Sequence, residues 1–104
     1  MSMATGFLEV YGLVAAFVAV DAGCKAAAVT VETLDKNKPG NADALPVPLI
    51  VMIKFRGTVE NVKAAVEAAA EAVTKVSGVV SKHIIANTEA STEKMLKLNA
   101  FDKN

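Results

Sequence analysis

The side chains that could do chemistry are few, and they are scattered along the chain. The sequence contains one histidine, His83, and one cysteine, Cys24, in different predicted elements. The serines Ser77, Ser81 and Ser91 lack the strand-to-helix glycine context of a nucleophile elbow. A catalytic triad or a metal centre needs several such groups that converge. We therefore predict no catalytic residue and no metal site.

Carboxylates and glycines do not change this prediction. Asp21, Asp35 and Asp43 could supply carboxylates, but their spacing fixes no pair at the separation that acid–base catalysis needs. Gly40 stands alone in its loop, and the sequence contains neither Gly-x-Gly-x-x-Gly nor a Walker motif. We expect no phosphate cradle and no bound cofactor.

His83 and Cys24 have simpler structural interpretations. His83 lies in a predicted strand, which favours a position at a sheet edge or a subunit contact. Cys24 lies in a predicted helix, and a free cysteine is usually a buried, small apolar side chain. A single cysteine also excludes an internal disulfide and, within one chain, a Cys-rich metal or iron–sulfur site.

Composition narrows the class of protein. The 104 residues suit one domain with a modest core, which oligomerisation would help to stabilise. Eleven basic and eleven acidic residues leave no net charge, which argues against nucleic-acid and membrane-surface partners. Although 53% of residues are apolar, no run approaches the roughly 20 that span a bilayer. Residues 1–5 lack the charged start of a signal peptide, so we expect a soluble, cytosolic protein.

The helix expected at 13–28 is unusually apolar. Its only charged residues are Asp21 and Lys25, which lie four apart on one stripe. Many of its other residues are alanines, whose small side chains allow neighbouring elements to approach closely. A helix with so little polar surface is expected to be covered on more than one side. We predict that it is shared between the domain core and a subunit interface.

Hydrophobic periodicity predicts the remaining elements. In the helix at 58–76, Thr58 is the expected N-cap, and apolar positions recur at helical spacing as far as Val76. The predicted strands are 5–11, 29–34, 49–56 and 79–85, and the helices are 13–28, 58–76 and 89–98, before a frayed end at 101–104. This order is an α+β, ferredoxin-like β-α-β-β-α-β arrangement: an antiparallel sheet backed by helices, plus a short C-terminal helix. We expect a single domain over 1–104 with an extended hairpin loop at 35–48.

The hairpin loop is the most distinctive segment. It is long for a hairpin connection and contains Pro39, Pro46 and Pro48, which restrict its backbone. Long loops of this kind are usually functional or disordered, and an ordinary surface loop is the alternative. The segment 44–48 is apolar enough to pack against the protein, which leaves 36–41 as the polar, outward part.

Several segments of the chain resemble one known family. Gly6-Phe-Leu-Glu-Val-Tyr-Gly-Leu-Val-Ala-Ala16 and Asp21-Ala-Gly-Cys-Lys-Ala-Ala27 resemble the opening of bacterial microcompartment shell proteins of the single-domain, hexamer-forming class. The corner Lys54-Phe-Arg-Gly-Thr-Val59 and the strand Val79-Val-Ser-Lys-His-Ile-Ile85 resemble later segments of that family. The resemblance continues between and beyond these segments, with gaps, over most of the chain.

The resemblance implies a non-enzymatic, structural function. In the family, six copies form a ring, and the hairpin loop surrounds a central pore that passes small metabolites. The expected partners are copies of this chain, other shell proteins and the permeating solutes, in the shell of a microcompartment in the cytoplasm. The expected pore-lining residues are Lys36, Asn37, Lys38, Pro39, Gly40 and Asn41.

The chain also departs from the family pattern. Lys25 matches an edge lysine, but Ala86 and Asn87 replace a Pro-Arg pair that helps one hexamer grip the next. We therefore expect Lys25 and Asn87 to lie between oligomers and arrays to be weaker or differently curved. The long loop is similar to that of shell proteins around glycyl-radical enzymes, such as those for choline breakdown. Some of these hold an iron–sulfur cluster on loop cysteines, which this loop lacks.

A second function class is consistent with the same fold. An oligomeric, ligand-sensing regulator of ferredoxin-like fold could close the long loop over a nucleotide or small effector. It would need a phosphate-binding motif, which the sequence does not contain. Six copies under native conditions would favour the shell protein, and three copies stabilised by a ligand would favour the regulator.

Overall fold

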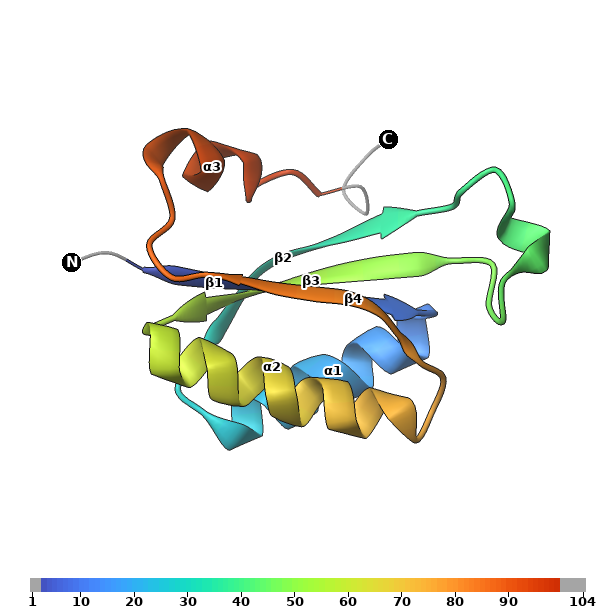
Figure 1. The fold of residues 1–104 in the computed structure, drawn as a ribbon, viewed down its shortest axis with the longest axis horizontal. Helices are drawn as coiled ribbons and strands as arrows, with labels where there is room; N and C mark the ends of the chain where they lie inside the picture. The colour runs from blue at the N-terminus through green and yellow to red at the C-terminus, as the bar shows by residue number, and fades with distance from the viewer. Residues whose placement is uncertain (1–2, 100–104) are drawn as a thin grey trace.

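A computed structural model describes residues 3–99 of the chain (Figure 1). The predicted α+β order is confirmed. The elements are β1 (Ala4–Tyr11), α1 (Leu13–Ala26), β2 (Thr30–Asn37), a 3-10 turn η1 (Ala42–Ala44), β3 (Ile50–Gly57), α2 (Val59–Thr74), β4 (Val79–Ile85) and α3 (Ala90–Met95).

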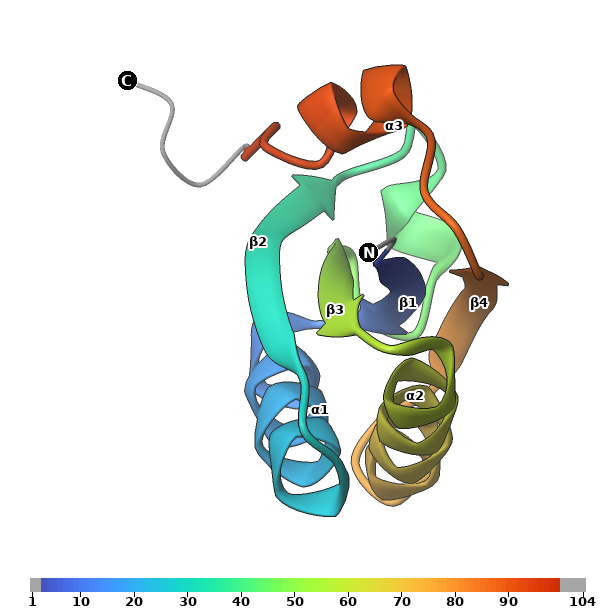
Figure 2. The same cartoon turned by 90° about the vertical axis from the view of Figure 1, so that its left-hand side faces the viewer.

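The four strands form one antiparallel sheet in the order β2-β3-β1-β4. The first strand is therefore central, and Leu8 pairs with Ile53 on one side and Lys82 on the other. Helices α1 and α2 lie side by side under one face, and α3 lies over the other (Figures 1 and 2). We call the face under α3 the open face. This is the ferredoxin-like arrangement that the sequence predicts.

Alternation along the strands separates the two faces. Val51, Ile53 and Phe55 of β3 are fully buried in the core against the helices. Lys54 and Arg56, between and beyond them, point to the open face, because successive strand residues alternate. The alternation of apolar and charged residues along β3 therefore determines which face of the sheet packs against the helices.

The alanine-rich stripe of α1 belongs to the core of the same chain. Ala16 and Ala19 have no exposed surface, and a Cβ on Gly23 would lie 2.7 Å from a ring carbon of Phe55. Leu13, Val14 and Phe17 are exposed instead, so the outward face of the first half of α1 is apolar. Any interface made by this helix therefore uses that face and not the alanines.

Cys24 is exposed, so the predicted buried thiol is wrong. On α1 the buried position of that turn is taken by Gly23, and the next residue is rotated by about 100° toward solvent. The exposed Asp21 and Lys25, which lie four residues apart on one stripe, form an i,i+4 ion pair, with Lys25 Nζ 2.9 Å from Asp21 Oδ2.

The bounds of the later helices differ from the prediction. The N-cap of α2 is confirmed, since Thr58 Oγ1 accepts a hydrogen bond from the Asn61 N–H. The helix ends at Thr74, however, and Val76 lies beyond it, half exposed. Helix α3 spans only Ala90–Met95 of the predicted 89–98. The frayed end predicted at 101–104 lies outside the described residues.

Strand β2 is longer than predicted. Asp35, Lys36 and Asn37 continue the strand, where they pair with Met52, Val51 and Ile50 of β3. The polar sequence of this stretch indicates a turn, but the apolar start of β3 provides a partner strand. The loop proper is therefore 38–49 and not 35–48, and two of the six predicted pore-lining residues are strand residues.

Candidate functional site

The hairpin loop projects from one end of the sheet (Figure 1). Among the predicted pore-lining residues, Lys36, Asn37, Lys38, Gly40 and Asn41 are exposed, and Pro39 is partly buried. The structure thus places all six together, at the end of β2 and the start of the loop. Three amide-bearing or cationic side chains in succession give this end of one chain a polar, hydrogen-bonding surface.

Local hydrogen bonds order the loop. The N–H groups of Ala42 and Ala44 donate to the carbonyls of Pro39 and Asn41, at 3.0 and 2.9 Å. Ala42 is buried and closes this turn. The prediction that 44–48 packs against the protein holds for the partly buried Leu45 and Val47, whereas Ala44 and the two prolines are exposed.

Gly12 fixes the base of the loop. Its φ of 94° lies in the region that favours glycine. Its N–H donates to the Leu49 carbonyl at 2.8 Å, and a Cβ there would lie 3.3 Å from Val47 Cγ1. The start of α1 and the end of the loop are therefore held together.

A small polar hollow lies where β2 meets the loop. Its volume is about 70 Å³, and Glu9, Asp35, Lys36, Asn37, Ile50 and Met52 line it. Glu9 accepts a hydrogen bond of 2.6 Å from the Ser81 hydroxyl, and Asp35 accepts one of 2.9 Å from the Lys36 N–H. The hollow carries charges of both signs next to the exposed loop.

Lys25 and Asn87 lie at the other end of the molecule. Both are exposed, Lys25 in the last turn of α1 and Asn87 just after β4. The strands that separate this end from the loop are seven or eight residues long, which corresponds to about 25 Å. A residue that contacts another oligomer and a residue that lines an axis would need such a separation.

Two cations lie on the open face beneath the C-terminal segment. The Arg56 guanidinium contacts both carboxylate oxygens of Glu93, at 2.7 and 2.5 Å, and one oxygen of Glu32 at 3.2 Å. Lys54 Nζ donates to the Leu98 carbonyl at 2.7 Å, to the Thr33 hydroxyl at 3.0 Å and to the Leu96 carbonyl at 3.3 Å. Both cations are nearly inaccessible, so these contacts replace water.

The surroundings shift two pKa values in this cluster. The hydrogen bonds from Arg56 hold the pKa of Glu93 below its usual range. Burial lowers the pKa of Lys54, although the nearby charges of Asp35 and Glu32 act in the opposite direction. Glu93 is therefore a carboxylate held by a buried cation.

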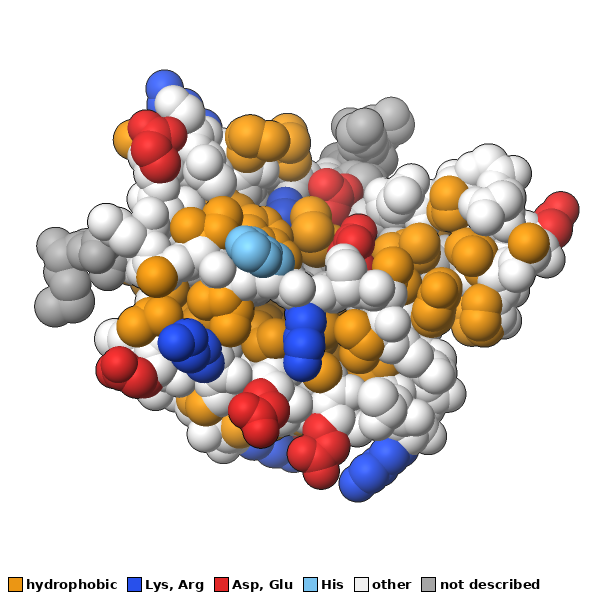
Figure 3. Space-filling view, viewed as in Figure 1, with side chains coloured by type: hydrophobic (Ala, Val, Ile, Leu, Met, Phe, Trp, Pro, Cys, Tyr) orange, Lys and Arg blue, Asp and Glu red, His pale blue; other side chains and the backbone are white. Residues whose placement is uncertain are grey.

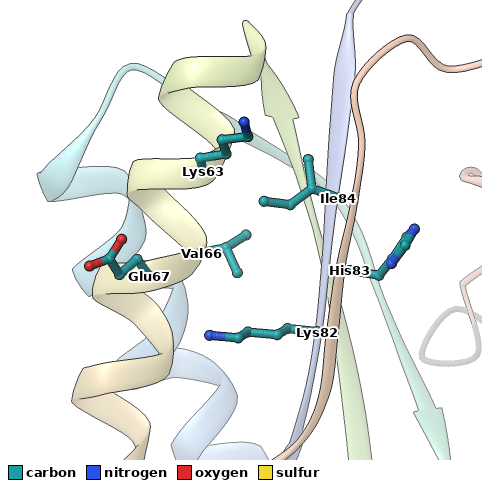
Figure 4. A pocket seen from close by; sticks show the side chains of 6 residues that line it. All are labelled: Lys63, Val66, Glu67, Lys82, His83 and Ile84. Atoms are coloured by element: carbon teal, nitrogen blue, oxygen red, sulfur yellow. The ribbon is translucent and has the colours of Figure 1, made fainter.

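A groove of about 630 Å³ runs between α2 and the edge strand β4 (Figure 4). Val66 and Ile84 form its apolar wall, and Lys63 and Lys82 extend into it from opposite sides. His83 points away from the groove, toward the open face, where it lies on the surface among apolar side chains (Figure 3). The predicted position of His83 at a sheet edge is confirmed.

Residues 3–99 contain no group of three or more side chains placed to hold a metal ion. Within the same residues, no helix has the length and apolar character needed to cross a membrane. Three distinctive features remain. They are the hairpin loop, the opposite end of the molecule with Lys25 and Asn87, and the polar groups that cover Lys54 and Arg56 on the open face.

Comparisons with known proteins agree with this geometry. The model of the BMC domain family matches residues 4–88. The chain is 36% identical over 100 residues to carboxysome shell protein CcmK2 of Synechocystis sp. (strain PCC 6803), covering 94% of this chain and 88% of the relative. It is also 36% identical over 100 residues to carboxysome shell protein CcmK1 of Thermosynechococcus vestitus, covering 94% and 80%.

A solved structure has the same fold. A microcompartment protein from Desulfitobacterium hafniense DCB superposes with a TM-score of 0.71 at 21% identity. The match covers 93% of this chain and 48% of that one, so this chain spans about half of that protein. On the family match and the relatives together, the chain belongs to the BMC domain family.

The cation cluster of the open face escaped the sequence analysis. Lys54 and Arg56 lie in an otherwise apolar strand, Lys-Phe-Arg, and this was the available signal. Charged residues that alternate with core residues in a central strand lie on the opposite face of the sheet. If they are buried there, they need polar partners. Glu93, which binds Arg56, lies 37 residues from it in sequence, so its identity could not be read from spacing.

Proposed function

We propose that this protein is a structural shell protein of a bacterial microcompartment. Its membership of the BMC domain family carries the proposal, and two relatives that it matches over most of their length are carboxysome shell proteins. The protein acts by assembly and not by catalysis. It resides with other shell proteins in the compartment boundary, inside the cytoplasm.

The assembly unit in this proposal is a ring of six copies. Lys36, Asn37, Lys38, Pro39, Gly40 and Asn41 surround its axis, and Lys25 and Asn87 lie at its rim. Support comes from the separation of the two sets to opposite ends of the strands and from the exposure of the loop side chains. Sixfold repetition turns one weakly polar loop into a ring of donors and charges.

In this arrangement Lys36 and Lys38 determine how the pore treats charged solutes. Each copy adds two exposed ammonium groups near the axis, partly offset by Asp35 and Asp43. A ring of lysines attracts anions by local potential, and salt screens that potential over roughly 10 Å at 0.1 M. The gatekeeping is therefore electrostatic as well as steric.

Two measurements test the proposal. Native mass spectrometry should give six copies, and three copies stabilised by a nucleotide would instead support a ligand-sensing regulator. In intact shells or reconstituted layers, the double variant Lys36→Glu, Lys38→Glu should slow anion passage, and added salt should reduce the difference.

A matched control separates the loop from net charge. Lys63→Glu with Lys94→Glu makes the same charge change at exposed positions away from the loop. It should leave anion passage near the wild-type rate. If both double variants behave alike in intact hexamers, the loop does not line the pore.

A further inference from the structure

The C-terminal segment is attached to the fold differently from every other described element. We call residues 90–98, which comprise α3 and the turn after it, the strap. Its helix has six residues, too few to be stable in water without a docking surface. Among the strap residues only Leu96 is buried, with 2% of its surface exposed. The strap is therefore held mostly by polar contacts.

The strap docks on three side chains of the open face, Thr33, Lys54 and Arg56, which we call the strap site. Arg56 binds the Glu93 carboxylate with two hydrogen bonds. Lys54 and Thr33 bind the carbonyls of Leu96 and Leu98, at 2.7 to 3.3 Å. Recognition thus needs a carboxylate, a buried leucine three residues later and the free carbonyls at a helix end.

The chain before the strap provides a hinge. Thr88 is fixed, since its N–H donates to the Met3 carbonyl at 3.1 Å and its hydroxyl lies 2.7 Å from that of the buried Thr5. Glu89 is exposed, and within residues 3–99 its hydrogen bonds run to the strap: its carboxylate accepts one from the Ser91 N–H and its carbonyl accepts one from the Glu93 N–H. The strap can leave at Glu89 without breaking any sheet pairing.

We propose that the strap detaches as a unit and that the strap site accepts the strap of a second copy in its place. Every copy carries the same strap and the same site, so exchange restores the lost contacts. Between the fixed Thr88 and the start of α3 only Glu89 is free to extend, over about 3.5 Å, so exchange joins only copies whose open faces lie close together. This inference goes beyond the shell role and does not depend on a pore.

A peptide assay tests the recognition step. The full-length double variant Glu93→Gln, Leu96→Ala has an intact site and a weakened strap. A fluorescent peptide of residues 88–98 should bind it saturably, by anisotropy. A peptide with the same two changes should bind about tenfold more weakly or worse, since it lacks the charge-assisted bonds and the leucine.

The matched control peptide carries Met95→Ala, because Met95 is exposed and neighbours the buried Leu96. It should bind like the unmodified peptide. Absence of binding to a variant that is folded by circular dichroism would overturn the proposal, as would equal binding of all three peptides.

Exchange between whole chains is tested by mixing two variants. Isotope-labelled Arg56→Gln protein has a strap but a damaged site, and the Glu93→Gln, Leu96→Ala protein supplies a site. Amide hydrogen exchange in α3 of the labelled chain should slow after mixing. If it does not slow, although the peptide binds in trans, the strap is detachable but is not exchanged. Where Arg56→Gln does not fold, the peptide assay decides the recognition step and Lys54→Gln replaces it in the mixing experiment.

These outcomes are separate from those that test the shell role. Loss of exchange in a protein that still forms hexamers by native mass spectrometry overturns the strap proposal alone. A chain that binds the peptide but forms no hexamer overturns the ring alone.

Discussion

The two faces of the sheet are covered by different kinds of contact, apolar on one and polar on the other, although strand β3 contributes residues to both. On the helix side, Ile53 and Phe55 pack against alanines and valines with no exposed surface. On the open side, Lys54 and Arg56 are also nearly inaccessible, but polar groups cover them: the Glu93 carboxylate and two carbonyls of the strap, and the Glu32 carboxylate of β2. At these four β3 positions the degree of burial is similar on the two faces, but the chemistry of the covering groups differs.

This difference indicates which face determines the fold. Apolar packing is close and tolerates neither added charge nor added volume. Hydrogen bonds within the protein can be replaced by hydrogen bonds to water at a small net cost in free energy. The strap can therefore detach while the sheet stays folded. We expect substitutions on the helix side to unfold the protein and substitutions on the open side to release the strap.

The largest effect is expected for a charge placed between the helices. Ala65→Glu, at a position on α2 with no exposed surface, should lower the free energy of unfolding by about 3–5 kcal/mol or prevent folding. Ala64→Glu is the control, since Ala64 is exposed on the same helix. Denaturant unfolding measures both. Similar stabilities would mean that the α1–α2 packing is not the core.

A smaller effect is expected when the strap loses its only buried side chain. Leu96→Ala should cost about 2 kcal/mol of strap docking and should speed amide exchange in α3 while leaving β1 and β3 protected. Met95→Ala is the neighbouring control at an exposed position. Loss of protection across the whole sheet would show that the two faces are not independent.

Acid should weaken the open side first. The pKa of Glu93 is lower in the folded chain than in the unfolded one, so its contribution is present above the ordinary carboxyl range and is lost as pH falls through the folded value. The groups that face it are Arg56 and Lys97, with Glu32 on the same guanidinium. Exchange in α3 should accelerate in acid, and Glu93→Gln should remove most of this pH dependence.

The smallest effect on stability is expected at the rim. The Lys25 side chain is 76% exposed and forms a surface ion pair with Asp21, so Lys25→Ala should change the free energy of unfolding by no more than about 0.5 kcal/mol. Ordered arrays should nevertheless be reduced in electron micrographs, with hexamers intact. Loss of the hexamer would place Lys25 in a different interface.

Much of the fold followed from local patterns. Strand alternation in 49–56 and the helical spacing after Thr58 identified β3 and α2, and their order gave the ferredoxin-like topology. The wrong predictions concern residues whose conformation or burial is determined by tertiary contacts. Asp35, Lys36 and Asn37 read as a turn but pair with β3, and Cys24 is exposed because Gly23 fills the buried position beside it.

The candidate site was predictable in part. Lys36 to Asn41 lie at one end of the molecule and all but Pro39 are exposed, but lining a pore is a property of several chains, so that role stays a prediction. The pairing of Arg56 with Glu93 joins distant parts of the sequence, and no periodicity encodes it. The glycyl-radical subtype stays a prediction.

The central position of β1 has a consequence for how the protein is made. Leu8 must pair with Ile53 and then with Lys82, so β1 leaves the ribosome before either of its partner strands and is among the last strands to be completed. Pairings between residues this far apart along the chain slow folding, because the connecting segments lose conformational entropy before the new contacts stabilise the fold. During synthesis both edges of the apolar segment that forms β1 are unpaired, so it can pair with other nascent chains. The subunit is therefore expected to finish its sheet only after synthesis through β4, and to assemble afterwards.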